Sequence, residues 1–165
     1  MSFSYRSGDC VVSGDFDILN KLVKELGKDY FVDVGILGQE RALNGMTLAG
    51  IGAVHEFGNR TRKIPERSFI RAPLRDHQEE ISRTVQGNGQ TRLEAGDIKG
   101  IFKDIGIACE QQIQAAFDTS GDGKWAPLSE NYRIRPSGKP VTSSSKQLID
   151  TGALRKAITS KVGGA

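Results

Sequence analysis

The sequence predicts an α+β protein, a single domain over residues 1–165 with a long helix, some strand and extended loops. Three stretches lead to this prediction. Residues 30–37 are rich in β-branched and aromatic residues and form the clearest strand. Residues 97–117 carry apolar residues at helical spacing and form the longest helix. Residues 118–147 are dominated by Gly, Ser, Pro and charge, which is typical of a long loop.

The composition limits the partners and the compartment. The core must be mostly aliphatic, because 37% of the residues are hydrophobic and only 7% are aromatic, and a net charge of +3 requires neither nucleic acid nor an anionic membrane. Cys10 and Cys109 lack metal-site spacing, so free thiols in a reducing compartment are expected. No apolar run approaches the roughly 20 residues of a spanning helix, and the first residues lack a secretion signal. We therefore expect a soluble protein that starts in a cytosol, with no membrane partner.

The first part of the chain predicts strand, helix and strand. Cys10 to Val12 is a β-prone run between glycines and predicts an edge strand. Asp15 or Asp17 can cap the next segment, a helix that ends at Gly27 and carries apolar residues at i, i+3, i+4 and i+7. In the strand at 30–37, alternation predicts one apolar face, made by Val32, Val34 and Ile36.

The middle of the chain predicts helices separated by glycines. After a polar loop at 38–44, Thr47 caps a helix that runs to Phe57, and Gly58 suits the left-handed residue that closes it. Pro65 fits the first turn of a new helical piece or the exit from an extended one. Residues 76–86 predict a charged helix, which Gly87-Asn88-Gly89 should break.

The long helix at 97–117 carries one apolar stripe that should be core. Its central members are Ile101, Phe102, Ile105 and Ile113. Gly100 and Gly106 lie beside the stripe and would let another backbone approach closely. Order should resume at residues 148–149, after which Asp150 or Thr151 caps a last helix to Ile158 and little remains to pack.

Two segments resemble metal sites, and both lack an essential ligand. His55-Glu56 begins the helical zinc motif, but Asn59 stands where the second His is needed, so His55 and Glu56 should cap or bridge neighbouring elements. Asp118 to Gly123 is similar to the start of a calcium loop, but position twelve is Ser129, and Glu130 comes one residue late. Since no nucleophile elbow or P-loop is present either, no metal, cofactor or catalytic site is expected.

Basic residues gather in one stretch of the sequence. The cluster consists of Arg60, Arg62, Lys63, Arg67, Arg71 and Arg75. Such clusters can neutralise phosphates, but base stacking needs aromatic residues, and only Phe69 lies among these cations. A solvated face or a protein interface is therefore favoured, and a nucleic-acid-binding module is the alternative from a different functional class.

Two blocks of sequence carry a resemblance to a known family. The first comprises Val34-Gly35-Ile36, Thr47-Leu48-Ala49, Ala53-Val54-His55-Glu56-Phe57-Gly58 and Ile64-Pro65-Glu66-Arg67-Ser68-Phe69-Ile70-Arg71. The second comprises Gly123-Lys124-Trp125-Ala126-Pro127-Leu128-Ser129 and Leu148-Ile149-Asp150-Thr151-Gly152-Ala153-Leu154-Arg155-Lys156-Ala157-Ile158. In this order they resemble the signature of tailed-bacteriophage neck and tail-completion proteins, a group that includes the Mu-like virion morphogenesis proteins.

The resemblance implies an α+β fold with a small mixed or antiparallel sheet, a long helix packed on it, and no catalysis. It also implies a ring of subunits at the head–tail junction, in the virion neck or tail after assembly in the host cytoplasm. The partners would be other copies of the chain, head-side connector or adaptor proteins, and tail-terminator or tail-tube proteins, with DNA passing nearby. A tail-terminator or head-closure subunit is the alternative within the same class. Family members often have a closing strand after the last helix, and only Thr159 to Val162 remain here to form one.

A ring subunit needs exposed loops that reach its neighbours, and three are predicted: the loop before Thr47, the basic loop at 59–63 and the segment at 118–147. Trp125 in the last loop is either an interface anchor or a plug that holds the loop on its own core. The candidate interface residues are Arg60, Arg62, Lys63, Arg67, Arg71, Trp125 and Arg155.

Overall fold

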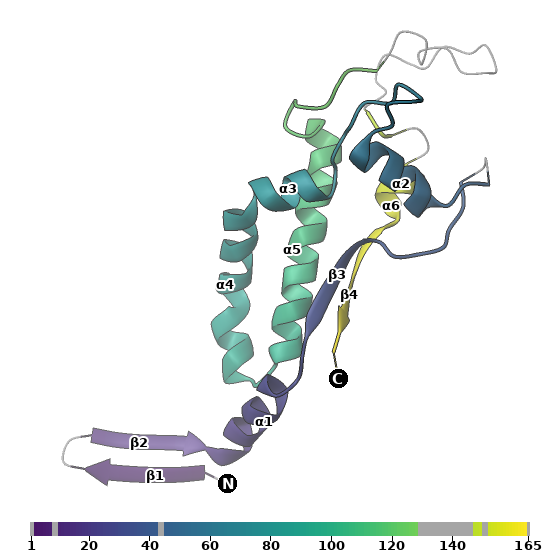
Figure 1. Ribbon diagram of the computed structural model, residues 1–165. Helices are drawn as coiled ribbons and strands as arrows, with labels where there is room; N and C mark the ends of the chain where they lie inside the picture. The colour runs from purple at the N-terminus through teal and green to yellow at the C-terminus, as the bar shows by residue number, and fades with distance from the viewer. Residues whose placement is uncertain (1, 8–9, 43–44, 129–146, 150–151, 165) are drawn as a thin grey trace.

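A long helix forms the spine of the molecule. The computed structural model describes residues 2–7, 10–42, 45–128, 147–149 and 152–164. Helix α5 (Ile98–Thr119) runs along the length of the body, α4 (Gln78–Glu94) packs beside it, and a ribbon of two strands lies on its other side (Figure 1). The predicted α+β fold, with a small antiparallel sheet and a long packed helix, is therefore confirmed.

The described strands form two separate antiparallel ribbons. β3 (Phe31–Ile36) pairs with β4 (Ile158–Gly163), with Phe31 opposite Gly163 and Ile36 opposite Ile158. The closing strand that the family resemblance implies is thus present, and the end of the chain is paired. β1 (Ser2–Ser7) and β2 (Cys10–Asp15) form the second ribbon, beyond the far end of the body (Figure 1). The strand predicted at Cys10 is confirmed. The sequence does not predict β1, because half of its residues are serines, which have little β preference.

The helices predicted before residue 60 are confirmed together with the long helix. α1 spans Phe16–Leu26 and α2 spans Leu48–Phe57. Thr47 caps α2, since its hydroxyl accepts a hydrogen bond from the Gly50 amide at 3.1 Å. Asp97 caps α5 in the same way, with its carboxylate 2.9 Å from the Gly100 amide nitrogen.

The break predicted at Gly87-Asn88-Gly89 is wrong, because α4 continues through all three residues. Each glycine costs about 1 kcal/mol of helix propensity relative to Ala. Packing of α4 along α5 offsets this local cost. A methyl group added at either glycine would meet no atom within 4 Å, so the glycines serve no close approach.

The end of the chain also differs from the prediction. The last helix, α6, covers only Ala153–Lys156, and its N-cap is Gly152 at φ 76° with no side-chain cap. The caps predicted at residues 150–151 lie outside the described residues. Ile158 does not end a helix but begins β4, because the β-branched residues that follow it suit pairing with β3. The loop predicted from residue 118 begins later, since α5 extends to Thr119, and residues 129–146 lie outside the described part of the chain.

The core lies where α5 ends. Its buried members are Phe69, Ile113, Ala116, Phe117, Trp125, Leu154 and Ile158. Of the four central members of the predicted stripe, Ile113 is fully buried, whereas Ile101, Phe102 and Ile105 are half-buried, because the thin β3–β4 ribbon covers α5 incompletely there. Gly106 does allow a close approach, since a Cβ on it would lie 2.6 Å from the Ser160 hydroxyl of β4. None of the described helices is long and apolar enough to cross a membrane.

Candidate functional site

Residues 58–64 form a projecting loop held by its own backbone. Gly58 ends α2 at φ 71°, and a Cβ on it would lie 2.8 Å from the Glu66 amide nitrogen, so the position requires glycine. Its ψ of 173° is not that of a left-handed helical residue, so the predicted closing conformation is right only in φ. Asn59 and Ile64 exchange backbone hydrogen bonds at 2.8 and 2.9 Å, and the Asn59 side chain accepts from the Arg62 amide at 2.9 Å. The side chains of residues 60–63 are therefore exposed on a fixed backbone.

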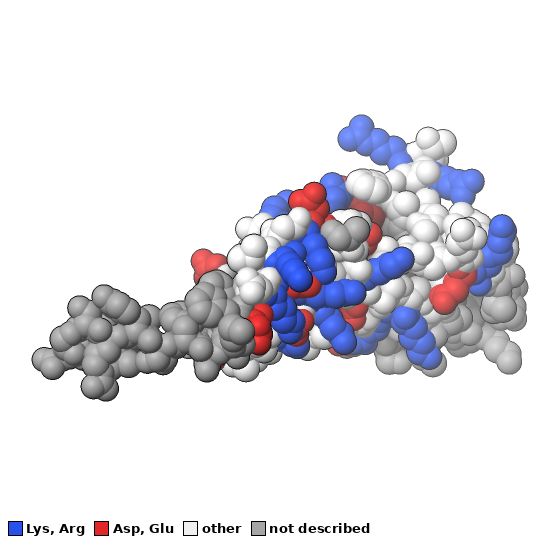
Figure 2. Space-filling model, turned by 90° about the horizontal axis from the view of Figure 1, so that it is seen from below, with Lys and Arg blue, Asp and Glu red and all other residues white. Residues whose placement is uncertain are grey.

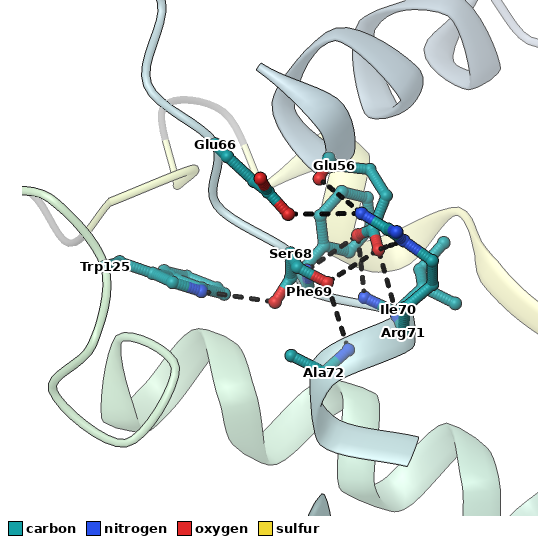
Figure 3. A network of polar contacts seen from close by, with 8 residues as sticks. All are labelled: Glu56, Glu66, Ser68, Phe69, Ile70, Arg71, Ala72 and Trp125. Carbon is teal, nitrogen blue, oxygen red and sulfur yellow. Dashed lines mark hydrogen bonds and ion pairs between the residues drawn. The ribbon is translucent and has the colours of Figure 1, made fainter. Parts of the chain in front are cut away.

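Glu56, in the last turn of α2, joins this loop to the segment that follows it. Glu56 is only 4% exposed. Its carboxylate accepts hydrogen bonds from the Ser68 hydroxyl at 2.7 Å and from three successive backbone amides (Figure 3). These are the amides of Phe69 at 2.8 Å, Ile70 at 3.0 Å and Arg71 at 3.0 Å. The prediction that Glu56 bridges neighbouring elements is confirmed.

The charge of Glu56 follows from these contacts. Burial by itself would raise the pKa of the carboxyl group, but hydrogen bonds from Ser68, Arg71 and Ile70 outweigh burial and lower the pKa. The pKa of its neighbour His55 is lowered too, which for a histidine favours the neutral form. Burial, together with nearby Arg67, lowers the pKa of His55, and its Nδ1 has no hydrogen-bond partner among the described residues. The pair is therefore an ionised Glu beside a neutral His, and neither belongs to a group of three possible metal ligands within the described residues.

Arg71 lies on the solvent side of Glu56 and contacts both Glu56 and Glu66. Its Nε lies 3.0 Å from the Glu56 carboxylate, and its Nη2 lies 3.1 Å from the Glu66 carboxylate (Figure 3). Its guanidinium carbon lies 4.4 Å from the ring centroid of Phe57, which is 62% exposed. Sequence reasoning missed this exposed aromatic residue. The signal was available in α2, where the buried residues Leu48, Gly52 and Glu56 recur every four positions and leave the next residue on the solvent side.

Arg67 and Trp125 are internal, which corrects their assignment to an exposed interface. Arg67 is 6% exposed, and it donates through Nε and Nη2 to the carbonyl oxygens of Ala126 at 3.0 Å and Pro127 at 3.1 Å. Buried carbonyl groups need donors, and a guanidinium group supplies several in a fixed plane. Trp125 is 8% exposed, and its indole N–H donates to the Ser68 carbonyl at 3.3 Å (Figure 3). Its ring meets that of Phe117 edge-on. Of the two interpretations of Trp125, this geometry is that of the plug.

Arg155 and the acidic residues after α5 are also paired inside the chain. Arg155 binds both carboxylate oxygens of Asp118, at 2.9 and 2.6 Å, and so joins α6 to the end of α5. Asp122 lies 3.0 Å from Nε2 of His77. The described residues contain no group of three His, Cys, Asp or Glu that could hold a metal ion. The two remaining positions of the calcium-loop pattern, Ser129 and Glu130, lie outside the described residues.

A shallow hollow lies beside Trp125. Its volume is about 270 Å³, and Ser68, Asp76, Asp122 and Lys124 are among the residues that line it. Lys124 pairs with Asp76 at 2.9 Å, and hydrogen bonds from Arg75 and then Lys124 lower the pKa of Asp76 to about 2. The charged residues named here therefore already have partners within the chain.

Three of the candidate interface cations have no partner within the described residues. Within the described residues, the side chains of Arg60, Arg62 and Lys63 make no hydrogen bond or ion pair, and the nearest carboxylate in sequence, Glu66, is engaged with Arg71. We call these three residues and the neighbouring Phe57 the basic loop surface. The sequence predicts the cations, but it does not reveal which ones are engaged, because that depends on buried acceptors brought from elsewhere in the fold.

The opposite end of the body carries charges of both signs. Seen from below, Lys and Arg lie there among fewer Asp and Glu (Figure 2). Several of these charges are paired: Lys28 with Glu25 at 2.7 Å, and Arg92 with Asp97 at 2.6 Å and with Asp104 at 3.0 Å. Other lysines of the described chain, among them Lys24, Lys99 and Lys103, make no hydrogen bond or ion pair, so unpaired positive charge is not confined to the basic loop surface.

Comparisons of the chain with protein-family models, with curated proteins and with solved structures find no match. What the site can do therefore rests on its geometry and on the sequence motifs that meet in it.

Proposed function

We propose that this chain is a structural virion protein at the head–tail junction of a tailed phage, where it forms a ring as a neck or tail-completion subunit. The observation that supports this proposal best is that the resemblance motifs meet in one place. Glu56 of the motif at 53–58 binds backbone amides of the motif at 64–71. Arg67 of this second segment binds the carbonyl group of Ala126, 59 residues away in the motif at 123–129. A Cβ on Gly52 would lie within 4 Å of Ile36, Phe69 and Leu154, which belong to three different parts of the signature.

The chemistry of this unit supports an assembly role. Apart from Nδ1 of His55, the buried polar groups of its described part are hydrogen-bonded to one another or to backbone groups. What the unit does is fix the direction in which the basic loop surface projects. A loop that is ordered before binding loses less conformational entropy on docking, which is the property an assembly surface needs.

The charge pattern favours a protein partner over DNA. A protein that follows a DNA backbone presents a stripe of cations, whereas the cations of the basic loop surface stand together on one short loop and the far end of the body is mixed in sign. An acidic patch on a neighbouring virion protein matches a surface of this size, with Phe57 available as an apolar contact.

Charge reversal in the phage tests the proposal. Arg60→Glu with Arg62→Glu should give filled heads and separate finished tails, because like charges placed opposite each other are penalised at an interface. The matched control is Arg75→Glu with Arg83→Glu, which makes the same change in charge at side chains that are 74% and 72% exposed. The control should give joined, infectious particles, since exposed ion pairs contribute only about 0–1 kcal/mol.

Two other outcomes of the loop variant carry distinct meanings. Joined particles that lose their DNA would favour the nucleic-acid alternative, in which the loop faces the channel. Joined particles that remain infectious would show that the basic loop surface is not a docking surface.

A further inference from the structure

The β1–β2 hairpin stands apart from the rest of the fold. Its strands pair from Ser2 opposite Asp15 to Ser7 opposite Cys10, and no third strand lies beside them in the described part of the chain. The hairpin lies beyond α1, at the end of the molecule away from the core (Figure 1). A two-stranded hairpin by itself is at best marginally stable in water. The hairpin therefore needs an additional surface to pack on.

Helix α1 keeps the hairpin away from its own β3–β4 ribbon. β2 ends at Asp15 and α1 begins at Phe16, so no linker residue separates the two elements. The 11 residues of α1 make an arm about 16 Å long. Lys21 on this arm donates a hydrogen bond to the Ala95 carbonyl at 3.1 Å, which ties α1 to the turn between α4 and α5. The surface that covers the hairpin must therefore come from another molecule.

The β3–β4 ribbon has the backbone groups that a strand of the hairpin could pair with. Each of its strands is six residues long, as are β1 and β2. Among the described residues, no backbone hydrogen bond joins β3 or β4 to a third segment. Its outer edges therefore present unpaired N–H and C=O groups, which are a template for strand addition.

Exposed apolar residues lie at the start of the ribbon and on the arm before it. Val23 and Leu26 near the end of α1, and Phe31 at the start of β3, are 62%, 68% and 53% exposed.

We propose that the β1–β2 hairpin of one copy adds to a free edge of the β3–β4 ribbon of a second copy, which makes a four-stranded sheet across the subunit boundary. A second copy is the partner because each chain carries both a hairpin without a packing surface and a ribbon with open edges, in strands of equal length. The contact joins two different surfaces, so it repeats from copy to copy and gives either a closed ring or an open chain. Closure into a ring rests on the proposed function, whereas the contact itself does not.

Thiol crosslinking of the full-length protein tests this contact. The native Cys10 of β2 serves as the probe, and Cys109→Ser removes the half-buried thiol of α5. One new cysteine is then added at an exposed position of the ribbon, either Asp33→Cys in β3 or Thr159→Cys in β4. A short bismaleimide, which tolerates a shift of a residue or two in register, should give a covalent ladder of dimers, trimers and higher species with one of these variants. The reactive variant identifies the edge that is used.

The control places the new cysteine on α4, as Arg83→Cys, where the side chain it replaces is 72% exposed. This variant should give no ladder beyond a dimer through Cys10. The proposal is overturned if neither ribbon variant gives a ladder, or if the wild-type protein sediments as a monomer at every concentration. If ladders form but heads and tails join without this protein, the contact stands and the head–tail function fails. Loss of the basic loop surface should leave the ladder unchanged.

Discussion

Glu56→Gln is the most informative single substitution in the network beneath the basic loop surface. Gln keeps the size of the side chain but replaces one carboxylate oxygen by an NH₂ group, which cannot accept a hydrogen bond. Oε1 of Glu56 accepts from Ser68 and from both the amide and Nε of Arg71. Oε2 accepts from the amides of Phe69 and Ile70. If the Gln oxygen stays at the Oε1 position, the two amides at Oε2 lose their acceptor.

The expected cost follows from these two amides. A buried donor left without a partner costs about 1–3 kcal/mol, so two of them cost about 2–6 kcal/mol. A domain is typically stable by about 5–15 kcal/mol, so the loss is a large part of the total. Arg71 adds little to this cost, because its side chain is 54% exposed and can turn to water.

Urea unfolding followed by circular dichroism measures the loss, and Glu66→Gln is the control. Glu66 also contacts Arg71, at 3.1 Å, but its side chain is 58% exposed, so its loss should change the free energy of unfolding by about 0–1 kcal/mol. If the two variants lose the same free energy of unfolding, the Glu56 network does not hold the segment and our reasoning is wrong.

The pH dependence of unfolding provides a second test of the Glu56 network. The folded-state pKa of Glu56 lies below the ordinary value of 4.5, so its contribution to stability is complete above pH 4.5 and is lost as the pH falls through the folded pKa. The difference in stability between the wild-type protein and Glu56→Gln should therefore shrink on acidification. A difference that stays constant down to low pH would contradict an ionised Glu56.

The remaining predictions concern the core, α4, His77 and metals. Phe117→Ala should lower the free energy of unfolding by about 3–5 kcal/mol, because the ring is fully buried between Phe69 and Trp125, whereas Ile107→Ala at an exposed site of the same helix should cost less than about 1 kcal/mol. Gly87→Ala should raise the free energy of unfolding by about 0.5–1 kcal/mol, and a loss would contradict the continuity of α4. A hydrogen bond to Asp122, helped by Glu80, raises the pKa of His77, so its charge stabilises the fold below the ordinary pKa of 6.5, and this is lost as the pH rises through the folded pKa. His77→Gln should accordingly lower the melting temperature more in mild acid than in mild base, and equal shifts would refute this. EDTA should leave the melting temperature unchanged, and a drop that calcium or zinc reverses would reveal a metal site.

Local signals predicted those elements that carry their own caps and periodicity. α2 and α5 each begin at a capping side chain and carry regular apolar spacing, so both were predictable. α4 was not, because the cost of its glycines is local while the packing that offsets it comes from α5. The strand at 158–163 pairs with residues far back in the chain, at 31–36, and no local pattern reveals that pairing.

The sequence predicts which charged residues belong to the candidate site, but it does not predict how they are arranged or paired. The basic cluster and the bridging role of Glu56 follow from the sequence. The engagement of Arg67 with carbonyl groups at 126–127, and of Arg155 with Asp118, depends on contacts between distant segments. Those contacts decide that, among the predicted interface cations, Arg60, Arg62 and Lys63 are the ones left without an internal partner in the described residues.

The proposed role of the protein in joining heads to tails is tested most directly by a phage that lacks the gene. Electron microscopy of the lysate should show filled heads and separate finished tails, and adding the purified protein should restore joined, infectious particles. The Arg60→Glu, Arg62→Glu protein should fail to restore them, while the Arg75→Glu, Arg83→Glu protein should succeed. Joined and infectious particles in the lysate without any added protein would contradict the proposed function.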